Sequence, residues 1–290
     1  MGSGCSVKDV VELIKVRQTL FLVIAMYLGL VFAGSTNPYT YLIAGIVAFT
    51  SIAATTSINM VFDADIDAVM TRTRDRPLPR GVCDARKVLS VSLLALVASI
   101  IAAFILVNAY FALFVAIGAF ADIVLYTLYS KRRTWLSIFL GAVAGASPVL
   151  GGYAAVKGYI DIEAVLLSML IVSWIPAHIW TLAMHYRDDY ARAHIPMLPV
   201  VRSVATARKS IITSVVVFLT TLIALYMLGA VSLPAIVLTA VLGAAVLVTV
   251  RSCKPGACIT SFKLVNIMLG LCLASCIASR LIVPVTTPLH

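Results

Sequence analysis

Residues 59–79 read Asn-Met-Val-Phe-Asp-Ala-Asp-Ile-Asp-Ala-Val-Met-Thr-Arg-Thr-Arg-Asp-Arg-Pro-Leu-Pro, and we call them the first acidic segment. They follow an apolar run, residues 41–58, that is long enough to cross a bilayer. The segment brings four aspartates and three arginines to the edge of that run. Charged side chains at the centre of a membrane helix cost about 2.5–3.5 kcal/mol each on insertion scales, so chains keep them mainly where they are needed. We therefore expect a functional site here.

The composition predicts an integral membrane protein. Hydrophobic residues make up 62% of the 290 residues and charged residues only 12%, whereas soluble domains carry about 25% charged residues. The apolar residues form long runs, which indicate an all-α protein with nine transmembrane helices in a single domain, residues 1–290. The runs lie at about 18–34, 40–62, 88–107, 110–130, 134–156, 162–186, 209–228, 232–250 and 262–283.

The basic residues predict the orientation of these helices. Of the 22 lysines and arginines, all but Lys157 and Arg280 lie at the N-terminus or in alternate connections. By the positive-inside rule, this pattern places the N-terminus in the cytoplasm and the C-terminus outside a cell membrane. The net charge of +10 therefore reports topology, and no nucleic-acid partner is expected.

Two long inner connections, residues 63–87 and 187–208, carry the acidic residues. The second begins within the stretch Tyr-Arg-Asp-Asp-Tyr, residues 186–190, which we call the second acidic segment. Long connections in a tight bundle are usually functional. We expect the two segments to face each other and to share a polyanion through metal ions.

The first acidic segment has the spacing of a Mg²⁺ site. If the helix continues, Asn59, Asp63 and Asp67 lie on one face at i, i+4 and i+8, and Asp65 points elsewhere. Two carboxylates and an amide oxygen suit Mg²⁺, which completes its shell with water and substrate phosphates. The alternative is a helix end with solvated charges that pair with the following arginines.

The remaining charged candidates are weaker on their own. Asp188 and Asp189 are candidate site residues only because they lie on the same predicted membrane face as the first segment. Arginine suits phosphate oxygens, but basic residues such as Lys131 and Arg132 are also expected at a cytoplasmic helix end from topology alone. Together the groups favour a diphosphate whose departure is assisted electrostatically.

The six cysteines form no zinc-finger pattern. Cys272 and Cys276 read as small apolar residues of the membrane core. At Cys253 and Cys258, a disulfide or metal pair is the less favoured interpretation.

Four stretches resemble the UbiA superfamily of intramembrane prenyltransferases and, within it, the protoheme IX farnesyltransferase (heme O synthase) branch. The resemblance spans about residues 10–285 and includes the Asn59-x-x-x-Asp63-x-x-x-Asp67 pattern, with Met60 where the superfamily commonly has Asp. The four stretches are residues 65–78, Tyr126-Thr with Lys131-Arg-Arg-Thr134, Pro176-Ala-His-Ile-Trp180, and residues 188–200.

This resemblance implies nine helices around a central cavity, with the acidic motifs on the cytoplasmic side. It implies Mg²⁺-dependent ionisation of farnesyl diphosphate and attack by a vinyl group of protoheme IX, with water completing a hydroxyethylfarnesyl substituent. Heme A synthase or terminal-oxidase assembly factors are the implied protein partners. By position, the implied metal ligands are Asn59, Asp63, Asp67, Asp188 and Asp189, and the four aspartates among them are the implied catalytic residues. The implied diphosphate contacts are Arg72, Arg76, Lys131 and Arg132. The implied acceptor-side residues are His178, Trp180 and His185.

The chain departs from the family pattern at His194, Trp135 and Ser137, where the family tends to have Gly, Pro and Asn. Asp122 is a lone acid inside a predicted span and therefore a candidate functional residue, but the resemblance implies no role for it.

Other functions remain open from the sequence. A related enzyme could use a quinone precursor or a lipid as the acceptor. A transporter would concentrate its binding groups near the bilayer midplane, not at helix ends. A passive heme-binding protein would be indifferent to Asp63 and Asp67.

Overall fold

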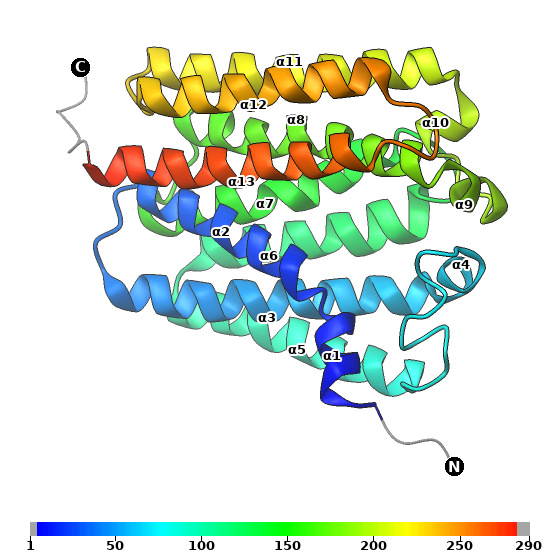
Figure 1. Cartoon of the computed structure of the whole chain (residues 1–290). Coiled ribbons are helices and arrows are strands. Elements are labelled where there is room, and N and C mark those ends of the chain that lie inside the picture. Colours follow the sequence, from blue (N-terminus) through cyan, green and yellow to red (C-terminus); the bar gives the residue numbers. More distant parts are fainter. Residues whose placement is uncertain (1–4, 283–290) are drawn as a thin grey trace.

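The computed structural model describes residues 5–282, and every regular element in that range is a helix (Figure 1). The elements are α1 (Val7–Leu13), α2 (Val16–Phe32), α3 (Pro38–Phe62), α4 (Ala64–Val69), α5 (Ala85–Leu106), α6 (Ala109–Phe120), η1 (Ala121–Ser130), α7 (Ser137–Lys157), α8 (Ile162–His185), α9 (Arg187–Arg192), α10 (Leu198–Val201), α11 (Val204–Met227), α12 (Leu233–Ser252) and α13 (Ile259–Ile282).

The helix lengths agree with the predicted spans. Eight helices in the described range are long and apolar enough to cross a membrane, and the α1–α2 pair, bent by 50°, makes a ninth if it is counted as one span. Helix α6 and the π-helix η1 together form one of the eight. The short helices α4, α9 and α10 lie at one end of the bundle, opposite the end where α13 finishes (Figure 1).

Capping side chains define where several spans begin. Asn37, Asp84, Asn108, Asp161 and Ser203 each accept a hydrogen bond from a backbone amide in the first turn of the helix that follows. Such caps satisfy amides that have no partner within the helix. These polar residues therefore convert the ends of apolar runs into fixed helix starts.

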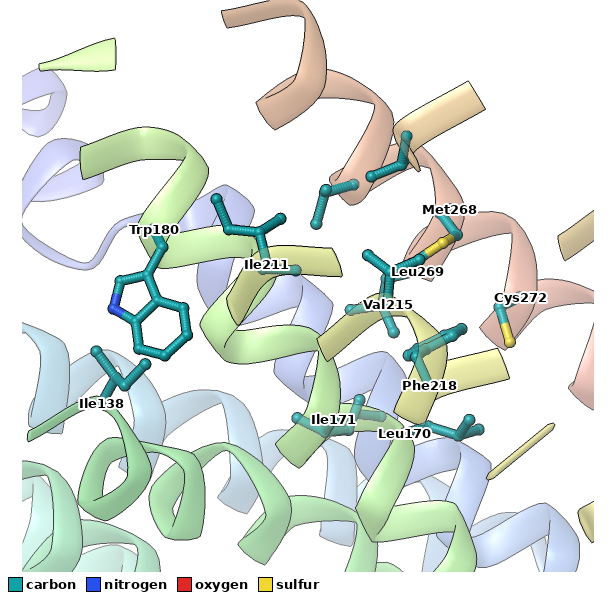
Figure 2. Packing of buried hydrophobic residues seen from close by; sticks show 14 of the residues in the cluster. Ile138, Leu170, Ile171, Trp180, Ile211, Val215, Phe218, Met268, Leu269 and Cys272 are labelled. Carbon is teal, nitrogen blue, oxygen red and sulfur yellow. The ribbon is translucent and has the colours of Figure 1, made fainter. Parts of the chain in front are cut away.

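The largest core cluster joins α7, α8, α11 and α13. Ile138, Ile171, Trp180, Phe218 and Met268 pack together there (Figure 2). Further along α7, small residues let two backbones approach closely. A Cβ added to Gly29 of α2 would lie 2.2 Å from the Val149 carbonyl oxygen of α7. Close packing at small residues is typical of helices in membranes.

Two disulfides fasten the connections at the end of the bundle that carries α4 and α9. Cys5 is bonded to Cys83, which links the start of α1 to the connection before α5. Cys253 is bonded to Cys258 between α12 and α13, so the lower weight given to this pairing from the sequence was wrong. Cys272 and Cys276 are free and buried, as expected.

Candidate active site

A cavity of about 830 Å³ opens into the bundle between α2, α3, α6, α7, α8 and α13. Its charged lining residues come from the helix ends and connections near α4 and from η1. They are Lys15, Arg17, Asp63, Asp67, Arg72, Arg76, Asp122, Lys131 and Lys263. Aromatic and aliphatic side chains, including Phe111, Phe114 and Ile138, line other parts. The cavity thus combines an ionic region with an apolar one.

The first acidic segment brings its three predicted ligands to this cavity. Helix α3 ends at Phe62, but the Asp63 amide still donates to the Asn59 carbonyl at 3.0 Å, and the Asp67 amide to the Asp63 carbonyl at 2.8 Å. The i, i+4, i+8 alignment therefore survives the junction with α4. Asn59, Asp63 and Asp67 are 7%, 4% and 4% exposed, and all three line the cavity.

Each aspartate of this segment's helical part has a basic partner. Arg76 Nη1 lies 2.7 Å from Asp67 Oδ2, and Lys131 forms an ion pair with Asp63. Asp65 points away from the cavity, where its side chain is 64% exposed and pairs with Arg132 at 2.7 Å. Arg132 consequently contacts Asp65 and the Phe62 carbonyl and does not line the cavity.

Lys15 also reaches this cluster, although the sequence analysis did not select it. Its Nζ donates to Asn59 Oδ1 at 3.4 Å, while Asn59 Nδ2 donates to Thr127 Oγ1 at 2.6 Å. Lys15 lies at the bend between α1 and α2 with φ 45° and ψ 54°. A left-handed conformation at a non-glycine residue stores strain that is often found at functional sites. No sequence pattern marks this conformation.

The second acidic segment is only partly engaged. Asp189 of α9 is buried, accepts a hydrogen bond from the Arg72 backbone amide at 3.2 Å and forms an ion pair with Arg192. Arg192 also donates to Thr71 Oγ1 at 2.8 Å. Asp188 is exposed, and neither aspartate lines the cavity. Asp189 therefore fastens α9 to the first acidic segment, and a metal role for Asp188 or Asp189 stays a prediction.

The three acceptor-side candidates separate in space. His178 lines the cavity, and its ring packs between Trp174 and Phe262 with centroid distances of 4.3 and 5.0 Å. Trp180 packs against Trp135 and Phe139 in the core instead. His185 contacts Tyr186 and does not line the cavity. The structure thus brings only His178 of the three to the cavity.

The donor set fits a hard divalent cation completed by a substrate. Within residues 5–282, no group of three or more His, Cys, Asp or Glu side chains could hold a metal ion by itself. Asp63 Oδ1, however, is buried with no hydrogen-bond partner. Unpaired buried carboxylate oxygens are costly. A Mg²⁺ ion, which uses one or two carboxylates and takes further oxygens from water and phosphates, matches this arrangement.

Solved structures show the same architecture. A digeranylgeranylglyceryl phosphate synthase aligns with a TM-score of 0.75 at 18% identity, over 95% of this chain and 99% of that one. A UbiA homologue from Archaeoglobus fulgidus, bound to DMAPP and Mg²⁺, aligns with a TM-score of 0.65 at 15% identity, over 95% and 100% of the two chains. At these identities the likeness establishes the fold alone.

Curated relatives are closer in sequence. A protoheme IX farnesyltransferase from Thermofilum pendens is 41% identical over 92% of this chain and 96% of its own length. One from Hyperthermus butylicus is 51% identical over 67% of this chain and 65% of its own length, a little under two thirds. The model of the UbiA prenyltransferase family matches residues 20–271, which include all the cavity residues described above except those at the start of α2. This chain therefore belongs to the UbiA prenyltransferase family.

Proposed function

We propose that this membrane enzyme transfers the farnesyl group of farnesyl diphosphate to a vinyl group of protoheme IX, giving heme O and diphosphate. The observation that carries the proposal is a cavity in which the buried Asn59–Asp63–Asp67 face adjoins an apolar interior. The similarity to protoheme IX farnesyltransferases supports the choice of both substrates.

Asn59, Asp63 and Asp67 would hold Mg²⁺, and the unpaired Asp63 Oδ1 would be one of the ligand atoms. When bound, the ion would neutralise negative charge on the departing diphosphate. Of the two aspartates in the second segment, Asp189 would support this site, because it accepts a hydrogen bond from the Arg72 amide.

Arg76, Lys131 and Arg72 would bind the diphosphate oxygens. Arg76 and Lys131 now pair with Asp67 and Asp63, the same carboxylates that a cation would occupy. A cation at those carboxylates would free both basic side chains for the phosphates, where cationic groups stabilise developing charge. Arg132 is left out of this set because it faces Asp65 outside the cavity.

The apolar interior would serve both organic substrates. Phe111, Phe114 and Ile138 offer an apolar surface for an isoprenoid chain and would keep most water from the reacting carbon. The rings of Trp174, His178 and Phe262 form a packed aromatic group beside the cavity, against which a flat porphyrin could stack.

The distribution of basic residues supports a cytoplasmic location for the site end of the bundle. The N-terminus would then face the cytoplasm and the C-terminus the outside. Heme A synthase or terminal-oxidase assembly factors would be the protein partners, as the resemblance to protoheme IX farnesyltransferases implies. Labelling single introduced cysteines with an impermeant maleimide in intact cells, one before α5 and one after α11, tests this orientation.

A detergent assay tests the reaction. Purified enzyme is incubated with protoheme, farnesyl diphosphate and Mg²⁺, and the pigment is separated and weighed by mass spectrometry. We expect a mass gain of farnesyl plus water that disappears with EDTA and returns with added Mg²⁺. Consumption of the diphosphate only with a quinone precursor or a lipid acceptor would keep the family and overturn the proposed acceptor.

A further inference from the structure

Asp122 lies on the one π-helix of the described residues, and this geometry determines what it faces. In η1 the backbone bonds extend to the fifth residue, as in the 2.8 Å bond from the Lys131 amide to the Tyr126 carbonyl. In an α-helix, residues five apart, such as Tyr126 and Lys131, point to different sides. Here Asp122, Tyr126 and Lys131 all line the cavity. π-Helical turns occur frequently at functional sites.

Along this span, Asp122 marks the boundary between two kinds of lining. Phe111, Phe114 and Gly118 precede it and give an apolar wall, whereas Tyr126 and Lys131 follow it and lead to Asp63. The nine residues from Asp122 to Lys131 separate the two side chains by on the order of 10 Å along the helix. A prenyl diphosphate held at Lys131 would place its first carbon near this boundary, because the diphosphate group itself occupies part of that length.

The Asp122 carboxylate is not used by the fold. Within residues 5–282 it makes no hydrogen bond or ion pair, and its backbone carbonyl, not its side chain, accepts from Thr127 Oγ1 at 2.7 Å. Lys15, Lys131 and Asp63 are the charged groups near enough to act on it. An ionisable group inside a span that lines a cavity is a functional residue by default.

We propose that Asp122 is a catalytic residue that accepts the proton from the water molecule ending the reaction, an inference that rests on the proposed function. The terminal vinyl carbon bonds to the first farnesyl carbon while the bond to the diphosphate oxygen breaks, and the electron pair leaves with diphosphate. The cation now on the carbon next to the porphyrin takes up water. The added oxygen loses one proton to the Asp122 carboxylate, which leaves the hydroxyethyl product and requires no oxidant or reductant.

The alternative fate of that cation gives the test. Without a base to capture the water proton, the cation can lose a proton from the neighbouring carbon and form an alkene, a product lighter by one water. We expect Asp122→Asn to lower the ratio of hydroxylated to alkene product at least tenfold, while farnesyl diphosphate is still consumed. Asp122→Glu, which keeps a carboxylate, should retain mainly hydroxylated product at a lower rate.

Two further measurements protect the interpretation. Asp75→Asn, at an exposed acid that does not line the cavity, is the matched control and should keep the wild-type product ratio. Acetate added to Asp122→Ala should restore hydroxylated product, which a purely structural role would not explain. An unchanged ratio in Asp122→Asn, or a raised KM for farnesyl diphosphate with an unchanged ratio, would overturn the inference. A wild-type enzyme that makes no heme product would instead overturn the proposed function.

Discussion

The two acidic segments differ in how much of their charge the fold buries. The first places three polar side chains of one helix face in the cavity and matches the two acids with Arg76 and Lys131. The second buries only Asp189, which binds the Arg72 amide and Arg192, and leaves Asp188 exposed. Similar residue types therefore lie in different settings, because Asp63 and Asp67 line the cavity, whereas in the second segment Tyr190 lines it and the two aspartates do not.

This contrast indicates a division of labour. Under the proposed function, Asp63 and Asp67 would meet the ion and the diphosphate, whereas Asp189 holds the connection that carries Arg72 and Arg76. Substitutions in the two segments should consequently differ in size and in the kinetic constant that they change.

The largest effect is expected at the cavity face. Asp63→Asn or Asp67→Asn should lower kcat by about 10²–10³-fold or more, because each would weaken the binding of the cation that neutralises charge on the departing diphosphate. The protein should remain folded, which gel filtration and heme absorbance can check. Near-normal turnover in either variant at matched expression would refute the metal assignment.

A smaller loss should separate the two residues of the second segment. Asp189→Asn removes the charge that pairs with Arg192 and leaves one oxygen where the carboxylate uses two, one for the Arg72 amide and one for Arg192. We therefore expect a loss of about 10–100-fold, typical of groups that support a ligand. Asp188→Asn should cost less than the Asp189 variant, because Asp188 is exposed and contacts none of these groups. Equal losses in steady-state assays would mean that α9 turns both carboxylates toward the substrate.

The disulfides extend the same comparison to stability. Cys5–Cys83 closes a loop with a sequence separation of 78 beside the first segment, and Cys253–Cys258 closes one of 5. The longer loop restricts the unfolded chain more, so Cys83→Ser should lower the Tm more than Cys258→Ser. Thermal unfolding in detergent followed by circular dichroism measures both, and the reverse order would show that local contacts such as the 3.1 Å bond from the Gly256 amide to the Met184 carbonyl dominate.

The sequence predicted the spans and the face formed by Asn59, Asp63 and Asp67 well, because hydropathy and helical spacing are local properties. It did not predict the left-handed Lys15, the π-helix carrying Asp122 or the Cys5–Cys83 bond. Each of these depends on neighbours distant in the sequence. Trp180 and Arg132 show the same limit in another way: their motifs match the family pattern, but neither residue lines the cavity.

The smallest effect is expected at the Asp65–Arg132 ion pair, which lies outside the cavity. The hydrogen bonds from Arg132 lower the pKa of Asp65 below its ordinary value, against a smaller opposing effect of burial. A carboxyl with a lowered pKa adds stability above its unfolded pKa, about 3.9, and loses it as pH falls through the folded pKa. Because the pair is exposed, its contribution at neutral pH is about 0.5 kcal/mol or less.

Arg132→Ala should therefore lower the Tm only slightly at pH 7, and the difference from wild type should shrink as the pH is lowered below about 4. Turnover should fall far less than in Lys131→Ala, whose ammonium lines the cavity. Differential scanning fluorimetry over a pH series, with initial rates at pH 7, measures both quantities. A rate loss in Arg132→Ala as large as that in Lys131→Ala would contradict this assignment, because it would require Arg132 to leave Asp65 and reach the diphosphate during turnover.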